Sequence, residues 1–283
     1  MQASGATILC AERVCGPLSL GQLVGGLRQR LFFQQRHPQL LMLEHADEDS
    51  ALNAAADHLA AGIDPRRVAL IVPARIPELA QLRDTLAGLP HGAPPALDTA
   101  ALLAALRPGL VSPHAASAPE VAAANAVVRA VNAHAGGKVL HEAQPMLARR
   151  SPFAAPRVPL AAPVSDAAGL AATIEALPAG EALGLPAGET EGHPLFQLLE
   201  VFEHDLHFQD DLKAKFRRGG LSERVVKAHL LDCMEHALRP VRERRTALAA
   251  DRPALAHVLE QGTARARAAA CQALGQLRAV LPA

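Results

Sequence analysis

A glycine-rich stretch near the amino terminus has the composition of a phosphate-binding loop. The run Cys15-Gly-Pro-Leu-Ser-Leu-Gly-Gln-Leu-Val-Gly-Gly-Leu27 follows a short apolar segment at residues 6–10. A strand that leads through a glycine-rich turn into a helix presents backbone N–H groups that bind phosphate. Glycine is also common in turns for steric reasons, so a turn without a ligand is the other interpretation. The spacing matches neither the Gly-x-Gly-x-x-Gly motif nor a P-loop.

Two further groups of side chains have the types that bind metals or substrates. Residues 203–207, Glu-His-Asp-Leu-His, place two histidines three positions apart beside carboxylates, which is a possible metal-binding helix face. A solvated polar face explains the same pattern, and we predict no metal.

His45, Asp47, Glu48 and Asp49 follow a predicted strand, where α/β sheets bind ligands. An acidic helix start, stabilised by the helix dipole, is the alternative that we favour.

The elements that would position these residues alternate along the first half of the chain. Apolar runs at 6–10, 39–43 and 68–72 fit buried parallel strands, and 109–111 is a further candidate. Helical spacing of apolar residues follows at 20–34, 51–61, 77–86, 96–106 and 118–131. This alternation predicts an α/β fold with a Rossmann-like parallel sheet and right-handed crossovers.

The last third of the chain changes character. Residues 153–192 are rich in Ala, Pro and Gly and show helical spacing only at 167–176. Amphipathic helices are predicted at 193–207, 222–248 and 251–281, which favours a helical bundle. We therefore predict a nucleotide-binding-type domain at 1–150, a connecting segment at 151–192 and an α-helical domain at 193–283.

Composition limits the classes of protein that fit. Half of the 283 residues are hydrophobic, yet no apolar run approaches a membrane span and no signal peptide is evident. We therefore expect a cytoplasmic protein without a membrane partner, in which the four cysteines are reduced thiols. The 28 basic and 28 acidic residues cancel, but residues 212–283 hold 14 basic and 6 acidic residues. This excess predicts a basic carboxy-terminal module.

Segments in three regions of the chain resemble bacterial tryptophanyl-tRNA synthetases, which are class I enzymes with a Rossmann-like catalytic domain. Gly16-Pro-Leu-Ser-Leu-Gly-Gln-Leu-Val-Gly-Gly-Leu27 is similar to their signature loop. Leu59-Ala-Ala-Gly-Ile-Asp-Pro-Arg-Arg67 and Ile71-Val-Pro-Ala-Arg-Ile-Pro-Glu-Leu-Ala-Gln-Leu82 resemble the following strand and helix. The carboxy-terminal helices are matched by Phe216-Arg-Arg-Gly-Gly220, Leu238-Arg-Pro-Val-Arg-Glu-Arg-Arg245 and Gly262-Thr-Ala-Arg-Ala-Arg-Ala268. These segments occur in the family's order.

The resemblance implies an ATP site at the signature loop, where such enzymes form an aminoacyl adenylate. The family supplies a His or Thr, a Gly, and a His or Asn beneath the phosphates. The matching positions here are Ser19, Gly21 and Gln22, so the signature is altered and no catalytic residue is assigned. Together with Gly16, these residues are the candidate ATP contacts, and ATP is the cofactor that the resemblance implies.

A second family loop, Lys-Met-Ser-Lys-Ser, places lysines on the transferring phosphates. No lysine occurs between residues 139 and 212, and the basic residues there are Arg149, Arg150 and Arg157. Arginine does not simply replace a positioned ammonium group. Loss of one phosphate-stabilising donor costs roughly 10²- to 10³-fold in rate, so we expect adenylation to be severely reduced.

The resemblance also implies changes at the amino acid pocket. The family's indole-binding Asp falls on Leu102, with Asp98 four residues earlier, and its Gly-Glu-Asp-Gln run falls on residues 114–117 without being reproduced. The chain is shorter than a full synthetase, and we place the missing length between residues 89 and 96. The family uses part of this region for substrate closure and for subunit contact, so its loss would affect closure and the homodimer that the resemblance implies.

Two functional hypotheses follow. The first is a synthetase-like paralogue that is deficient in tryptophan activation and retains nucleotide, amino acid, tRNA or protein binding. The alternative is a divergent but active aminoacyl-tRNA ligase for tryptophan or another amino acid. Under either hypothesis, the resemblance implies tRNA contacts from Arg239, Arg242, Arg244 and Arg245, although a solvated helix face explains this cluster equally well.

Overall fold

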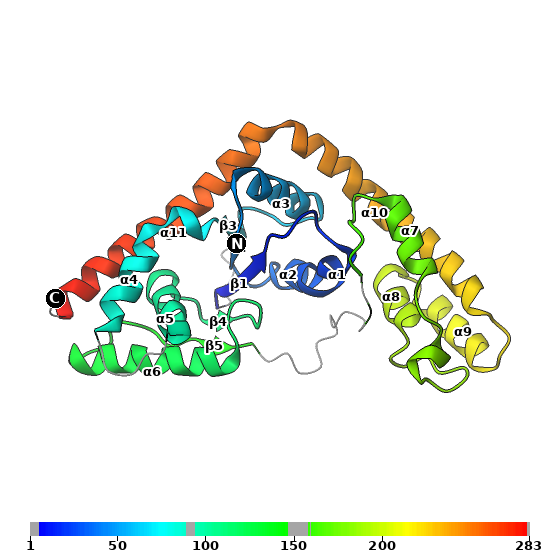
Figure 1. The fold of residues 1–283 in the computed structure, drawn as a ribbon, viewed down its shortest axis with the longest axis horizontal. Coiled ribbons are helices and arrows are strands. Elements are labelled where there is room, and N and C mark those ends of the chain that lie inside the picture. The colour runs from blue at the N-terminus through cyan, green and yellow to red at the C-terminus, as the bar shows by residue number, and fades with distance from the viewer. Residues whose placement is uncertain (1–5, 89–93, 147–157, 159, 282–283) are drawn as a thin grey trace. The chain divides into compact units, whose positions relative to one another are not determined.

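The structure is a computed structural model that describes residues 6–88, 94–146, 158 and 160–281 (Figure 1). The chain forms two compact units. Unit 1 comprises Met1–Gly16, Leu31–Arg149 and Leu248–Ala283, and unit 2 comprises Pro17–Arg30 and Arg150–Ala247. The predicted domains at 1–150, 151–192 and 193–283 stay a prediction, but these units are not continuous in sequence. Residues 17–27 of the signature loop belong to unit 2, and the last helix belongs to unit 1.

Unit 1 is built on a five-stranded parallel sheet, which confirms the predicted α/β fold. The strand order is β3-β2-β1-β4-β5. Strand β1 pairs with β2 along its whole length, with Ile8 opposite Gln39 at one end and Arg13 opposite Glu44 at the other. The strands are β1 (Ile8–Arg13), β2 (Gln39–Glu44), β3 (Val68–Ile71), β4 (Leu110–Val111) and β5 (Gln144–Pro145). The two-residue strand β5 was not predicted, because its sequence contains no apolar run.

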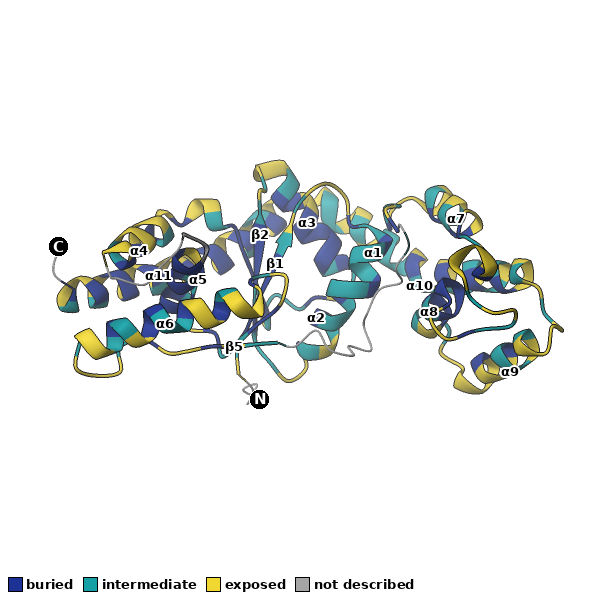
Figure 2. Cartoon of the chain, turned by 60° about the horizontal axis from the view of Figure 1, so that its bottom comes forward, coloured by how far each residue is buried: buried dark blue, intermediate teal, exposed yellow. Residues whose placement is uncertain are grey.

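The sheet is buried because helices cover it. Leu9, Leu41 and Leu70 from the three longest strands are fully buried, as the apolar runs predicted. Figure 2 shows most of β2 in the colour of buried residues. The helices of unit 1 are α3 (Glu48–Ala60), α4 (Pro77–Ala87), α5 (Pro94–Leu106), α6 (Ala118–His134) and α11 (Arg252–Val280), with a 3₁₀ turn at Pro73–Arg75. Asp47 and Ser117 cap α3 and α6 through their side-chain oxygens, which fixes where these helices begin.

Helix α11 lies in unit 1, where it packs on β3, α3, α4 and α5 (Figure 1). The expected basic carboxy-terminal module is therefore divided between the units. Residues 212–247 in unit 2 hold ten basic and four acidic residues, whereas residues 248–283 in unit 1 hold four and two. Helical periodicity alone could not reveal this, because it does not specify which surface an apolar stripe covers.

Unit 2 is helical. Its elements are α1 (Leu20–Gln22), a π-helix (Leu23–Leu27), the start of α2 (Arg28–Phe33), α7 (Ala167–Glu175), a 3₁₀ turn (Gly180–Leu183), α8 (Pro194–Phe202), α9 (Leu206–Arg217) and most of α10 (Glu223–Ala250). The predicted single helix at 193–207 is wrong. Glu203 is extended, and the Asp205 side chain caps a new helix, so α8 ends at Phe202. In the described part of the chain, no helix combines the length and apolar character that a membrane crossing requires.

Candidate functional site

The signature loop residues Ser19 and Gln22 bind one another. Ser19 caps α1, and its Oγ accepts a hydrogen bond from the Gln22 backbone N–H at 3.2 Å. The Gln22 Oε1 in turn accepts from the Ser19 backbone N–H at 2.8 Å and from the Ser19 hydroxyl at 2.9 Å. This reciprocal arrangement is a capping box, which satisfies helix N-terminal donors within the chain itself.

The next two N–H groups of the same helix end are also engaged. Leu20 N–H donates to the Ala162 carbonyl and Gly21 N–H donates to the Leu160 carbonyl, both at 2.9 Å. The segment containing these carbonyls continues past the loop, where Val164 N–H donates to the Leu18 carbonyl at 2.8 Å. The backbone donors that a phosphate would use at this helix end therefore already have protein partners.

Gly21 allows this close approach. A Cβ at Gly21 would lie 3.3 Å from the Leu160 carbonyl oxygen, which is tighter than ordinary van der Waals contact. Gly16 needs glycine for another reason, since its φ of +135° is unfavourable for other residues. A Cβ at Gly16 would meet no atom within 4 Å. The assignment of Gly16, Ser19, Gly21 and Gln22 to ATP stays a prediction, and Gly21 has a structural reason of its own.

The second synthetase loop is expected between residues 139 and 212. Arg149, Arg150 and Arg157, the candidate replacements for its lysines, lie outside the described residues. The sequence still contains no lysine between residues 139 and 212.

A cavity of about 520 Å³ opens in unit 1 beside the carboxyl ends of β2 and β3. It brings together three residues that the sequence singled out, namely His45, Asp98 and Leu102. Most of its wall is apolar, from Met42, Leu43, Pro73, Ala74, Ile76, Pro77, Leu79, Ala80, Ala101 and Leu102. The cavity has the size of a small-molecule site and the predominantly apolar lining typical of one.

The polar groups of this cavity are Glu44, His45, Arg83 and Asp98. Arg83 lies 3.8 Å from Asp98 and 3.0 Å from Asp84, so its charge is shared between two carboxylates. His45 has a φ of +58°, a conformation that is uncommon outside glycine. The arrangement suits a ligand with an apolar body and a charged end. Sequence reasoning located the strand ends, but the cavity required the fold.

The acidic residues after β2 mostly have structural roles. The Asp47 Oδ1 accepts a hydrogen bond from Ser50 N–H at 2.8 Å, and bonding to Ser50 lowers the pKa of the Asp47 carboxyl. Glu48 and Asp49 occupy the first turn of α3, and Asp49 forms an ion pair with Arg252. The favoured interpretation of an acidic helix start is confirmed for these residues.

The histidine pair at 204 and 207 does not share a helix face, because α8 ends between Phe202 and Glu203. The Glu203 carboxylate instead meets two residues of α10. Its Oε2 lies 2.8 Å from His229 Nε2 and 3.5 Å from Cys233 Sγ. Burial, together with the Glu203 carboxylate, raises the pKa of the Cys233 thiol to about 11, so the thiol alone is a poor nucleophile at neutral pH. Nothing in the sequence linked residues 203, 229 and 233.

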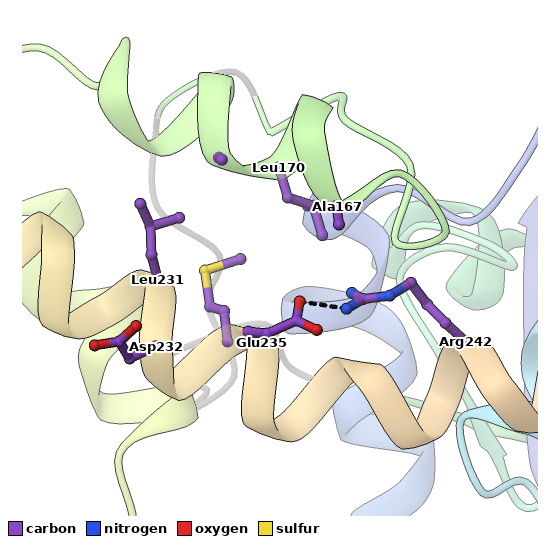
Figure 3. A pocket seen from close by; sticks show the side chains of 8 residues that line it. Ala167, Leu170, Leu231, Asp232, Glu235 and Arg242 are labelled. Carbon is purple, nitrogen blue, oxygen red and sulfur yellow. Dashed lines mark hydrogen bonds and ion pairs between the residues drawn. The ribbon is translucent and has the colours of Figure 1, made fainter.

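The arginines proposed to contact tRNA lie on α10. At 3.6 residues per turn, Arg239, Arg242 and Arg245 fall within about 120° of one another around the helix, whereas Arg244 lies on a different side. Arg239 and Arg244 are exposed. Arg242 forms an ion pair with Glu235 beside a cavity of about 210 Å³ between α7 and α10 (Figure 3). Their role in tRNA binding stays a prediction.

Comparisons with known proteins agree with the resemblance seen in the sequence. No family model matches the chain. It is 24% identical to the tryptophan–tRNA ligase of Streptococcus pyogenes serotype M3 and 26% identical to that of Streptococcus pneumoniae serotype 4, each over 340 residues of alignment that cover 97% of both chains. The alignments exceed the 283 residues of this chain, so those relatives contain residues that it lacks.

The fold is shared with a solved synthetase. The structure of tryptophanyl-tRNA synthetase from Campylobacter jejuni, complexed with ADP and tryptophan, matches with a TM-score of 0.79 at 16% identity and covers 96% of this chain and 98% of its own. At that identity, the match concerns the fold. The chain is therefore similar to tryptophan–tRNA ligases over nearly its full length and shares the fold of a tryptophanyl-tRNA synthetase, with a Rossmann-type sheet.

Proposed function

We propose that this protein is deficient in ATP-dependent tryptophan activation and aminoacylation, and that it retains a binding role for amino acid and tRNA. The observation that carries the proposal is the engagement of the signature helix. Its donors from Ser19 to Gln22 are bonded to the capping box and to the carbonyls of Leu160 and Ala162. Displacing these partners would cost a nucleotide part of its binding free energy.

Pyrophosphate exchange tests the loss of activation. The purified chain is assayed with ATP and each amino acid in turn, beside the Streptococcus pyogenes ligase under the same conditions. We expect no amino-acid-dependent exchange at synthetase rates, for two reasons. No lysine occurs where the second loop is expected, and the backbone N–H groups of the first loop are already bonded to protein carbonyls. A Gln22→Ala variant, purified identically, controls for a contaminating host synthetase. Tryptophan-dependent exchange at ordinary rates would establish the alternative, a divergent active ligase.

The cavity at the ends of β2 and β3 supports retained amino acid binding. Its apolar wall would accept a side chain, and Glu44 or Asp98 would attract an ammonium group. The chain contains no Trp and no Tyr, so the fluorescence of added tryptophan reports binding without protein background. We expect a saturable change that Ala101→Phe, which fills the cavity, abolishes. The exposed Ala133→Phe variant near the end of α6 is the control, and unsaturable titration would contradict retained binding.

Binding of tRNA is tested by a filter assay at two salt concentrations. Phosphate contacts release counterions, so affinity must fall as salt rises. We expect Arg239→Ala and Arg245→Ala each to weaken binding and to lower the salt slope by about one. Arg265→Ala, an exposed arginine on α11, is the control. Absence of binding at low salt would mean that the arginines of α10 form a solvated helix face and do not bind tRNA.

The homodimer that the resemblance implies is part of this proposal. The mass of the protein in solution tests it.

A further inference from the structure

Three potential metal ligands converge in unit 2, and none of them belongs to the signature loop or lines the cavity of unit 1. They are the Glu203 carboxylate, the His229 imidazole and the Cys233 thiol, and their ligand atoms all lie within 4.8 Å of one another. Cys233 Sγ lies 3.4 Å from His229 Nε2 and 3.5 Å from Glu203 Oε2. Among the described residues, this is the one group of three or more such side chains arranged closely enough to hold an ion.

The backbone holds the three side chains in place. His229 and Cys233 are four residues apart on the long helix α10, so they share one face a turn apart. Glu203 is fixed at the joint between α8 and α9. Its Oε1 accepts from Asp205 N–H at 2.8 Å, and its carbonyl accepts from the Gln209 side chain at 2.6 Å. The Phe208 ring lies against His229, with centroids 4.9 Å apart, and restricts the rotation of the imidazole.

Two of the three distances match the edges of a tetrahedral zinc site. With Zn–S near 2.3 Å and Zn–N or Zn–O near 2.1 Å, sulfur should lie about 3.6 Å from the other two ligand atoms, and nitrogen about 3.4 Å from oxygen. The two sulfur distances are 3.4 and 3.5 Å. The nitrogen–oxygen distance of 2.8 Å is shorter because these atoms are hydrogen-bonded to each other. A shift of about 0.6 Å between them would complete the geometry.

We propose that Glu203, His229 and Cys233 form a zinc-binding site that ties the α8–α9 joint to α10. The combination of sulfur, nitrogen and oxygen donors suits Zn²⁺ better than the hard cations Mg²⁺ and Ca²⁺, which prefer oxygen alone. Three protein ligands leave the fourth position to water. Side-chain exposures of 28% for His229 and 14% for Glu203 give the ion a path from solvent. Binding transfers the thiol proton of Cys233 to solvent and forms the Zn–S bond, and the Nε2 proton of His229 exchanges through solvent to Nδ1 so that Nε2 coordinates the ion.

Cobalt binding tests the site directly. The full chain, without a polyhistidine tag and kept reduced, is stripped with chelator and titrated with Co²⁺ and then with Zn²⁺. We expect one equivalent of Co²⁺ to give a thiolate-to-cobalt charge-transfer band with intense tetrahedral visible bands, and Zn²⁺ to displace it. A wild-type spectrum without a thiolate band would overturn the proposal, whatever the variants do.

Variants assign the ligands. Cys233→Ser should remove the charge-transfer band, and His229→Gln should weaken zinc binding by more than the 10- to 100-fold typical of losing an outer-shell partner. Cys15→Ser and His236→Gln, which alter an exposed cysteine and an exposed histidine of α10, should change neither. Zinc should raise the melting temperature of the wild type but not of Cys233→Ser. A band that persists in Cys233→Ser, or disappears in Cys15→Ser, would assign the metal elsewhere.

Discussion

Replacing Gly262 by alanine should separate the packing of α11 from its helix propensity. Gly262 is buried where α11 crosses β3. An alanine Cβ there would lie 2.0 Å from the Leu70 carbonyl oxygen, 3.0 Å from the Leu70 carbonyl carbon and 3.2 Å from the Leu70 nitrogen. These are backbone atoms of a strand that is hydrogen-bonded to β2, so they cannot move aside as a side chain would.

The expected magnitude follows from two opposing effects. Alanine in place of glycine favours a helix by about 1 kcal/mol. Relieving the clash requires α11 to retreat by more than 1 Å, which would loosen neighbours such as Leu259 and Ala266 on the same face. Overpacking of this kind costs about 1–3 kcal/mol when moderate, and a 2.0 Å approach to backbone lies at or above the upper end. We therefore expect a net loss of about 2 kcal/mol.

Gly275 on the same helix provides the matched control. It is exposed, and an added Cβ would meet no atom within 4 Å, so Gly275→Ala should gain up to about 1 kcal/mol from helix propensity alone. Urea unfolding followed by circular dichroism measures both variants. Because two units need not unfold together, amide hydrogen exchange of β3 reports the local effect. A Gly262→Ala protein as stable as Gly275→Ala would refute the packing of α11 on β3.

Three further predictions concern other contacts in the chain. Thr263 Oγ1 accepts a buried hydrogen bond from Val72 N–H at 3.1 Å, so Thr263→Val should lower the free energy of unfolding by about 1–3 kcal/mol in urea, whereas Thr263→Ser should retain most of it. Loss of the capping box in Ser19→Ala should cost about 1 kcal/mol and speed amide exchange in α1, and an unchanged exchange rate would contradict the structural role of Ser19. The pKa of Glu78 is lowered by a hydrogen bond from its own backbone N–H and by Arg267. The native state therefore binds fewer protons here than the unfolded chain, and the stability present above the ordinary carboxyl pKa is lost as pH falls through the lowered value. Glu78→Gln should show a shallower decline of melting temperature on acidification than the wild type.

The sequence predicted elements better than the surfaces on which they pack. Leu9, Leu41 and Leu70 lie in unbroken apolar runs, and such runs fit only strands buried on both faces. By contrast, the apolar stripe of α11 is compatible with either unit, and the deciding contact between Gly262 and Leu70 joins residues far apart in the sequence. The break after Phe202 was missed because residues 193–207 keep helical periodicity across it, whereas Glu203 is extended and the Asp205 side chain caps the start of the next helix.

The sequence was equally unable to show which backbone N–H donors of the signature loop are already bonded within the chain. Residue types at Ser19, Gly21 and Gln22 are compatible with phosphate binding, because each offers a donor or a close approach. Whether a donor serves a ligand depends on whether the chain has already used it, and the partners of Leu20 and Gly21 lie about 140 residues further along the chain, at Ala162 and Leu160. A helix end with satisfied N–H groups gains little from an anion beyond the dipole, which is worth about 0.3–1 kcal/mol in exposed sites. Introducing lysines between residues 139 and 212, where the second loop is expected, should therefore not restore activation by itself, since the N–H groups of Leu20 and Gly21 would still be bonded to the carbonyls at 162 and 160.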